Sequence, residues 1–413
     1  MYKIPIDNAS NLYPAVSGKH GSYAFRIAAE LNERIDGDRL MRAVHELVPR
    51  FPIMYSVLIR GVFNYYHVPA PNLAVVSKSP VPPAGAPFIN TDIPAFRIHY
   101  CDNRISVAVF HANGDAYAGM VYLRALLVRY FELAGTEIKP FPDIPRVGES
   151  VPPEELRDEY AHLGKPAKGA RAPLNEPDAY MLRTDFVPGF HRNIYFTMSA
   201  EDIKAYTKPR GLTVNDYLLS AVYASLLPYY DEKSELPLRL SVPINIRPHF
   251  SLVTLRNCAL YTNLSLYPGK LTSRDGVERE IRTQMKAGTD KDTLRALAAR
   301  NVSLADNAFL RCVPRALIDA GVRIGYKRFG SGKITTTLSN IGNITMPPEV
   351  ESRIKRFELL LGAGGGGVNF SAAGYCGSVT LCASLCTPDD TLPGIIKARL
   401  AADGIRFTLA EQK

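Results

Sequence analysis

A histidine and an aspartate four residues apart, His111 and Asp115, carry the clearest catalytic potential in this sequence. An imidazole with its ordinary pKa of about 6.5 accepts a proton near neutral pH, so a histidine held in a fixed pose suits a general base. The spacing alone is weak, because the 8 histidines and 40 acidic residues in 413 positions give about one such pair by chance. The surrounding elements must supply the specificity.

A strand and a helix are expected to position this pair. The odd-numbered residues from 105 to 109 are apolar and share a strand face with His111, whereas Phe110 points to the other side. Beyond Asp115, apolar residues recur at helical spacing, at Met120, Leu123, Leu127 and Tyr130. The sequence therefore predicts His111 in a strand-to-helix turn and Asp115 at the start of the helix, where an aspartate can also act simply as a cap.

The composition is that of a globular enzyme large enough for two domains. Of the 413 residues, 46% are hydrophobic and 22% are charged, a balance that argues against extensive disorder. A formal net charge of +9 admits an anionic ligand, but the basic residues are scattered along the chain. No nucleic-acid-binding module accompanies the charge, so we expect no nucleic acid partner.

The sequence carries no recognisable targeting signal or membrane span. The first residues, from Met1 to Asn8, lack the basic and apolar regions of a signal peptide, and no run of about 18 apolar residues occurs. We therefore expect a cytoplasmic protein whose six cysteines are reduced.

The last three cysteines invite a zinc interpretation, which their expected geometry opposes. Residues 377–385 alternate in the two-residue period of a half-buried strand, with Cys382 on one face. On such a strand Cys376 and Cys386 would lie roughly 33 Å apart, at about 3.3 Å per residue. Zinc–thiolate bonds are about 2.3 Å long. We predict no metal site.

The chain is expected to form two halves, residues 1–165 and 166–413. Eight prolines between positions 140 and 177, mixed with glycine and charged residues, oppose a continuous helix or central strand there. We interpret this segment as the crossover between the halves. Within the first half, Asp38 is expected to cap a helix that ends before Pro49.

Two segments of the second half have polar residues at informative positions. Residues 211–224 read as a helix with Thr213 as its N-cap and Asp216 completing a capping box. Residues 238–247 alternate apolar and polar side chains, which predicts a strand that carries Arg247 at its end.

Four motifs, in this order, resemble the CoA-dependent acyltransferase superfamily. They are His-x-x-x-Asp at 111–115, Thr-Val-Asn-Asp at 213–216, Val-Pro-Ile-Asn-Ile-Arg-Pro at 242–248 and Leu-Ser-Asn-Ile-Gly at 338–342. The superfamily includes chloramphenicol acetyltransferase, the plant BAHD enzymes and the condensation domains of nonribosomal peptide synthetases. The likeness is greatest to its alcohol acetyltransferase and polyketide-associated acyltransferase branches.

The resemblance implies an α/β (α+β) fold of two chloramphenicol-acetyltransferase-like halves, each a mixed sheet with flanking helices, around a central tunnel. His111 would be the general base, and Asp115 would pair with Arg247 and brace the loop. Ser339 and Asn340 would contact the substrate or donate hydrogen bonds to the oxyanion. Acyl-CoA would be a co-substrate, with no permanently bound cofactor and no acyl-enzyme.

The activity implied is transfer of an acetyl or other short acyl group from acyl-CoA to the hydroxyl, or the amine, of a small molecule. Two alternatives stay open: a condensation-like enzyme whose acyl donor is bound to a carrier protein, and a catalytically silent binding or regulatory paralogue. A basic strip would suit either the CoA phosphates or an acidic carrier protein, and it comprises Arg323, Lys327, Arg328 and Lys333.

The sequence departs from the pattern of the superfamily at several points. Phe110 stands where many members carry a first histidine, and Ala116 stands where they carry a glycine. The Asp-Phe-Gly-Trp-Gly segment of the BAHD enzymes is absent, and the chain has no tryptophan. The absence of this segment argues against the plant branch.

Simpler interpretations exist for each candidate residue. His111 could be a structural residue at a strand end, and Arg247 could be a solvated cation. Ser339 and Asn340 could belong to a turn. The glycines from Gly364 to Gly367 lack the following Lys-Ser/Thr of a phosphate-binding loop, so we interpret them as an ordinary loop.

Overall fold

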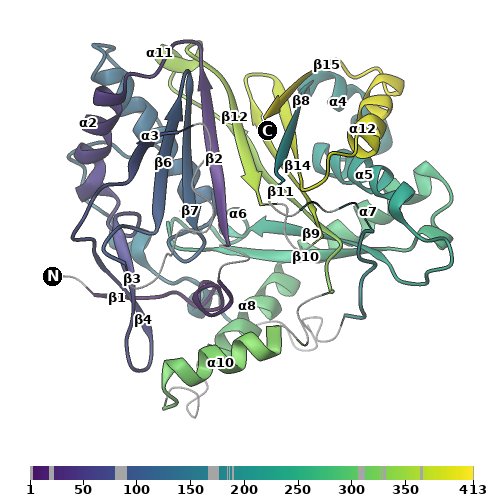
Figure 1. Ribbon diagram of the computed structural model, residues 1–413, viewed down its shortest axis with the longest axis horizontal. Helices are drawn as coiled ribbons and strands as arrows, with labels where there is room; N and C mark the ends of the chain where they lie inside the picture. The colour runs from purple at the N-terminus through teal and green to yellow at the C-terminus, as the bar shows by residue number, and fades with distance from the viewer. Residues whose placement is uncertain are drawn as a thin grey trace.

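Two β-sheets lie side by side in the computed structural model, each with helices on its outer side (Figure 1). The structure describes residues 3–17, 23–79, 91–165, 176–183, 185, 187, 190–305, 312–326, 328, 332–362 and 366–412. The predicted α/β fold of mixed sheets with flanking helices is confirmed.

The five-stranded sheet belongs mainly to the first half of the chain and has the order β12-β2-β7-β6-β5. All its neighbouring strands are antiparallel except β5 and β6. The strands are β2 (Ala24–Leu31), β5 (Val76–Lys78), β6 (Phe96–Cys101), β7 (Arg104–Phe110) and β12 (Ile354–Leu361). Because β12 comes from the second half and pairs with β2, the two halves share this sheet.

The seven-stranded sheet is built from the second half in the order β10-β9-β11-β13-β14-β8-β15. Strand β11 is parallel to both of its neighbours, and the other pairs are antiparallel. The strands are β8 (Arg192–Ser199), β9 (Leu238–Asn245), β10 (Ala259–Leu266), β11 (Thr336–Ile344), β13 (Val368–Tyr375), β14 (Ser378–Leu385) and β15 (Phe407–Gln412). A third, small sheet contains β1 (Ile4–Pro5), β4 (Tyr65–Pro69) and β3 (Ser56–Arg60).

Helices cover the outer faces of both large sheets (Figure 1). Beside the five-stranded sheet lie α2 (Gly37–Leu47) and α3 (Ala116–Glu132). Beside the seven-stranded sheet lie α4 (Ala200–Thr207), α5 (Val214–Leu226), α7 (Arg274–Gly288) and α12 (Thr391–Ala402). The remaining helices are α1 (Tyr13–Val16), α6 (Arg247–Phe250), α8 (Lys291–Ala305), α10 (Arg315–Gly325) and α11 (Pro348–Glu351). No helix among the described residues is long and apolar enough to span a membrane.

Strand alternation explains how the five-stranded sheet packs. The odd-numbered side chains of β2 and β7 are buried in one core cluster with residues of α2 and α3. The even-numbered side chains point to the opposite face. There Ala28 packs with Tyr195, Leu360 and Cys382, so the two sheets meet on this face.

Several sequence predictions of local structure are confirmed. Strand β7 precedes the His111 turn and helix α3 follows Asp115. Helix α5 begins after Thr213, whose hydroxyl accepts from the Asp216 amide while the Asp216 carboxylate accepts from the Thr213 amide. The six cysteines form no disulfides.

Other predictions were wrong in detail. The N-cap of α2 is Asp36 and not Asp38, because the Asp36 carboxylate accepts from two amides of the first turn. Strand β14 is buried on both faces, since it lies between two neighbouring strands and both faces of the sheet are covered. Strand β9 ends at Asn245, so Arg247 begins the short helix α6. The glycines at 364 and 365 lie outside the described residues.

The capping box of α5 predicts a measurable contribution to stability. Thr213→Ala removes the hydroxyl that satisfies a free amide of the first helical turn, so we expect the free energy of unfolding to fall by about 1 kcal/mol. Urea denaturation followed by circular dichroism measures this change. Thr283→Ala on the exposed side of α7 is the control, and we expect it to stay within about 0.5 kcal/mol. Equal effects of the two substitutions would contradict the capping role.

Candidate active site

His111 lies in the turn between β7 and α3, and its backbone is fixed by three other segments. Its amide donates to the carbonyl of Tyr23 at 3.1 Å. Its carbonyl accepts from the Asn257 side chain and from the Ser10 hydroxyl, both at 3.2 Å. The position of the histidine is therefore determined by contacts with both halves of the chain.

The imidazole ring of His111 is held by aromatic packing. It stacks on Tyr13 with ring centroids 4.8 Å apart and an interplanar angle of 16°, and Phe25 lies 4.8 Å away in a tilted arrangement. The ring nitrogen Nδ1 is buried and has no hydrogen-bond partner among the described residues. The ring is thus oriented by packing and not by a hydrogen bond to Nδ1.

Burial determines the charge state of this ring. It lowers the pKa of His111 from its usual value to about 4, and the nearby charge of Asp115 opposes this shift only in part. At neutral pH the imidazole is therefore uncharged and can accept a proton.

Asp115 is the N-cap of α3. Its carboxylate binds backbone amides and the Arg247 guanidinium, and no hydrogen bond between described residues joins it to the His111 ring. Its carboxylate accepts from the amide of Ala118 at 3.0 Å and from the amide of Cys258 at 2.8 Å. It also accepts two hydrogen bonds from Arg247, at 2.8 and 3.2 Å. The cap and the ion pair, which the sequence left as alternatives, are both present.

Arg247 uses all five of its guanidinium N–H donors at this place. In addition to the two bonds to Asp115, it donates to the carbonyls of Thr254 and Arg256 and to the side chain of Asn245. Only 3% of the residue is exposed, so the interpretation of Arg247 as a solvated cation was wrong. Because the charge is paired and every donor is satisfied, the guanidinium tolerates burial.

The residues that depart from the superfamily pattern are accommodated by local packing. Phe110 is fully buried in a small core cluster with Ile6, Leu58 and Tyr65, apart from the cluster that contains Phe25. Ala116 is the first residue of α3. Phe110 therefore fills an apolar site on the opposite side of the strand from the His111 ring.

Ser339 and Asn340 lie on β11, away from the contacts that hold His111. Ser339 pairs in parallel register with Ser371 of β13. The Asn340 amide donates to the side chain of Asn215 at the start of α5, and its oxygen accepts from the amide of Gly342. No hydrogen bond between described residues joins either side chain to His111.

The structure describes three of the four residues of the predicted basic strip. Arg323 donates to the backbone carbonyl of Ala15. Lys333 pairs with Asp178 at 2.7 Å. Arg328 is exposed, and Lys327 lies outside the described residues.

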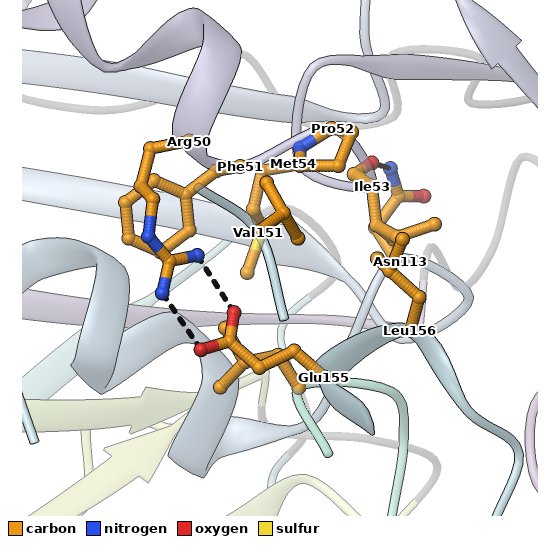
Figure 2. Close-up of a pocket in the computed structure, with 10 residues that line it drawn as sticks. Arg50, Phe51, Pro52, Ile53, Met54, Asn113, Val151, Glu155 and Leu156 are labelled. Carbon is orange, nitrogen blue, oxygen red and sulfur yellow. Dashed lines mark hydrogen bonds and ion pairs between the residues drawn. The ribbon is translucent and has the colours of Figure 1, made fainter. Parts of the chain in front are cut away.

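A narrow apolar cavity lies beside the His111–Asp115 turn (Figure 2). Arg50 and Glu155 form a bidentate ion pair at its edge, with both contacts at 2.7 Å. Asn113 donates to the carbonyl of Ile53 at 2.9 Å, whereas its own side-chain oxygen is buried without a partner among the described residues. The lining residues are Arg50, Phe51, Pro52, Ile53, Met54, Asn113, Val151, Glu155, Leu156 and Leu255. His111 is not among them.

Among the residues that contact the His111 turn, Tyr13 and Asn257 were missed by the sequence analysis. Tyr13 stacks on the imidazole, and burial raises its pKa to about 12. Asn257 binds the carbonyl of His111. Asn257 lies ten residues beyond Arg247, but no sequence pattern linked either residue to His111.

The Asp115–Arg247 pair predicts a strong mutational coupling. Arg247→Met leaves the buried Asp115 carboxylate without its counter-charge, so we expect stability to fall by about 3–5 kcal/mol. Asp115→Asn in the Arg247→Met background removes the unpaired charge and should recover part of the loss. A double-mutant cycle by urea denaturation measures the coupling, and simple additivity would contradict a direct pairing.

The sequence matches no family model and no curated protein at a significant level. Solved structures resemble the fold over nearly the whole chain. Polyketide synthase associated protein 5 from Mycobacterium tuberculosis is 14% identical with a TM-score of 0.58, covering 96% of each chain. F. sporotrichioides TRI101, solved with coenzyme A and T-2, is 11% identical with a TM-score of 0.61, covering 98% of this chain and 100% of the other.

The starter condensation domain of rhizomide synthetase RzmA, solved with C8-CoA and Leu-SNAC, is 10% identical with a TM-score of 0.59. The match covers 97% of this chain and 94% of that one. These proteins fall among the groups that the sequence motifs resemble. The chain therefore has the two-sheet fold shared by these coenzyme A complexes and by condensation domains of nonribosomal peptide synthetases.

Proposed function

We propose that this protein is an acyltransferase that moves an acetyl or other short acyl group from acyl-CoA to the hydroxyl, or the amine, of a small molecule. The observation that carries the proposal is the His111 imidazole, uncharged and fixed at the strand-to-helix turn by packing on Tyr13 and Phe25. The fold supports it, because solved structures of this fold contain coenzyme A or an acyl-CoA.

In the proposed reaction His111 accepts the acceptor's proton as the acceptor oxygen or nitrogen attacks the thioester carbonyl. The carbon–sulfur bond then breaks, and the thiolate of CoA takes the proton from the imidazolium. The transient positive charge on the ring is favoured by the nearby carboxylate of Asp115. No covalent intermediate with the enzyme is needed, so none of the cysteines has to act as a nucleophile.

The tetrahedral oxyanion needs a hydrogen-bond donor, and we propose Ser339 and Asn340 for this role. The support is their match in position to the superfamily motif and their place on β11. Donors of this kind typically contribute about 3–4 kcal/mol to transition-state stability. The tunnel between the halves and their boundary near residue 165 likewise stay part of the proposal.

A second candidate function is the same acyl transfer with a different acyl donor. Condensation domains of nonribosomal peptide synthetases share this fold, and one of them was solved with both an acyl-CoA and Leu-SNAC. An acyl group on a carrier-protein pantetheine is therefore the alternative donor. Reaction with acyl-loaded carrier protein but not with free acyl-CoA would favour this candidate.

The general-base role of His111 predicts loss of turnover on substitution. Purified protein with acetyl-CoA and a panel of small alcohols and amines should release free CoA, measured with a thiol reagent. We expect His111→Ala to reduce the rate by about 10²–10⁴-fold, the usual contribution of general-base catalysis. His45→Ala, at an exposed position of α2, is the matched control and should leave the rate unchanged. Equal rates for wild type and His111→Ala would exclude the role.

The low pKa of His111 predicts the acid limb of the pH profile. Only the neutral ring can accept a proton, so kcat/KM should rise with pH through about 4 and level off above it. An unperturbed histidine would give a midpoint near 6.5. Initial rates between about pH 3 and 8, in buffers of constant ionic strength, measure the midpoint. A midpoint at or above 6.5 would show that the ring is not buried in the working enzyme.

A further inference from the structure

A second cavity lies on the face of the five-stranded sheet that points away from α2 and α3. Its empty volume, open mouth included, is about 620 Å³. The residues that line it come from β2, β6, β7 and the turn between the last two, together with the residue after β5 and the end of β15. They include Arg26, His99, Asp102, Arg104, Ser106 and Gln412.

Three buried polar atoms of this lining have no hydrogen-bond partner in the part of the chain that the structure describes. They are Nε2 of His99, Nε of Arg104 and Oγ of Ser106. His99 is 3% exposed and Ser106 is 7% exposed. Leaving a buried polar group unsatisfied costs about 1–3 kcal/mol, so three such groups at one cavity point to a ligand.

Each of these groups can act as a donor. The other ring nitrogen of His99, Nδ1, lies 2.8 Å from the hydroxyl of Ser77, and when this hydroxyl donates, Nε2 carries the hydrogen. The remaining nitrogens of Arg104 are occupied by Tyr195, Gln412 and Glu358, which leaves Nε. A guanidinium nitrogen cannot accept, so the ligand must present acceptors.

Arg26 adds a further positive charge, which the nearby carboxylate of Glu358 stabilises only in part. It forms no ion pair with a described residue, whereas Arg104 shares Glu358 with Arg356. Burial, followed by the neighbouring charge of Arg104, lowers the pKa of Arg26 to about 10. Burial, Arg26 and Arg97 together lower the pKa of His99 to about 4. The only carboxylate among the lining residues is Asp102, in the turn between β6 and β7.

Strand register brings these side chains within reach of one another. His99 of β6 lies directly opposite Ser106 of β7, and Ala28 of β2 lies opposite Ser106 on its other side. Arg26 is two residues from Ala28 on the same strand face. Diagonal neighbours of this kind are about 7–8 Å apart, a distance that a guanidinium side chain spans.

We propose that Arg26, His99, Arg104 and Ser106 form a binding site for the phosphate group of a phosphate monoester, separate from His111. A phosphate group is acceptor-rich, doubly charged and matched to guanidinium donors in geometry. The cavity is larger than inorganic phosphate alone, which leaves room for an organic body. The site lies at the start of β7 and His111 follows its end, roughly 20 Å away at about 3.3 Å per residue.

Binding of inorganic phosphate to the full-length protein tests the proposal. Isothermal titration calorimetry should detect binding to wild type and at least about tenfold weaker binding to Arg26→Gln, as expected for loss of a charged hydrogen bond. Arg279→Gln on the exposed side of α7 is the matched control and should bind like wild type. No binding to wild type, or equal binding to Arg26→Gln and wild type, would overturn the proposal.

A second pair of measurements keeps the test informative if Arg26→Gln is difficult to produce. Ser106→Ala removes one donor without changing charge and should also weaken phosphate binding. In phosphate-free buffer Arg26→Gln should melt at the same temperature as wild type or higher, because it removes a positive charge that lies near Arg104 and has no ion-pair partner among the described residues. A strongly lowered melting temperature would show instead that Arg26 is structural.

The phosphate monoester could be a separate small molecule or the 3′-phosphate of the donor CoA, and kinetics distinguish these sources. This kinetic experiment rests on the proposed acyl transfer. If the site holds the donor, Arg26→Gln should raise KM for acetyl-CoA and leave KM for acetyl-dephospho-CoA unchanged. If it holds another molecule, both KM values should match wild type while phosphate binding is lost. Failure of acyl transfer itself would leave the calorimetric test intact.

Discussion

A buried ion pair between residues 132 positions apart, Asp115 and Arg247, fixes the start of α3 to the segment that follows β9. Burying two charges is unfavourable unless each is paired and its remaining hydrogen-bonding capacity is used. Here the carboxylate accepts four hydrogen bonds and the guanidinium donates five. Because these bonds fix both Asp115 and Arg247, the backbone of the turn that carries His111 can move little. The aspartate therefore acts on the site through backbone placement and charge, not by binding the imidazole.

The alternation of side chains along β7 places its odd-numbered and even-numbered residues in two different environments. Its odd-numbered side chains are buried against α2 and α3, which anchors the strand and the His111 turn that follows it. Its even-numbered side chains face the second sheet, where Arg104 and Ser106 meet Arg26 and His99 at the second cavity. Moving the register by one residue would exchange these faces. The position of the turn and the polarity of the cavity are thus determined by the same packing.

Local patterns in the sequence predicted much of this structure. The strand before His111, the helix after Asp115 and the capping box of Thr213 each depend on residues close in the chain, where period and capping chemistry are readable. The resemblance supplied the partner of Asp115 and the two-sheet fold. Contacts between segments far apart in the chain left no comparable pattern in the sequence. The stacking of Tyr13 on His111 brings together residues 98 positions apart, and β12 joins the sheet of the other half.

The missing first histidine of the motif is explained by the packing on the two sides of the strand. Phe110 is fully buried in an apolar cluster with Ile6, Leu58 and Tyr65, so a second imidazole there would be buried in a mainly apolar environment. The His111 ring is instead oriented by two aromatic neighbours, and its Nδ1 has no partner among the described residues. Packing fixes the plane of the ring but does not select a tautomer, since selection requires a hydrogen bond to one of the nitrogens. In the proposed reaction, the acceptor substrate would therefore select the tautomer that removes its proton, by donating a hydrogen bond to one ring nitrogen.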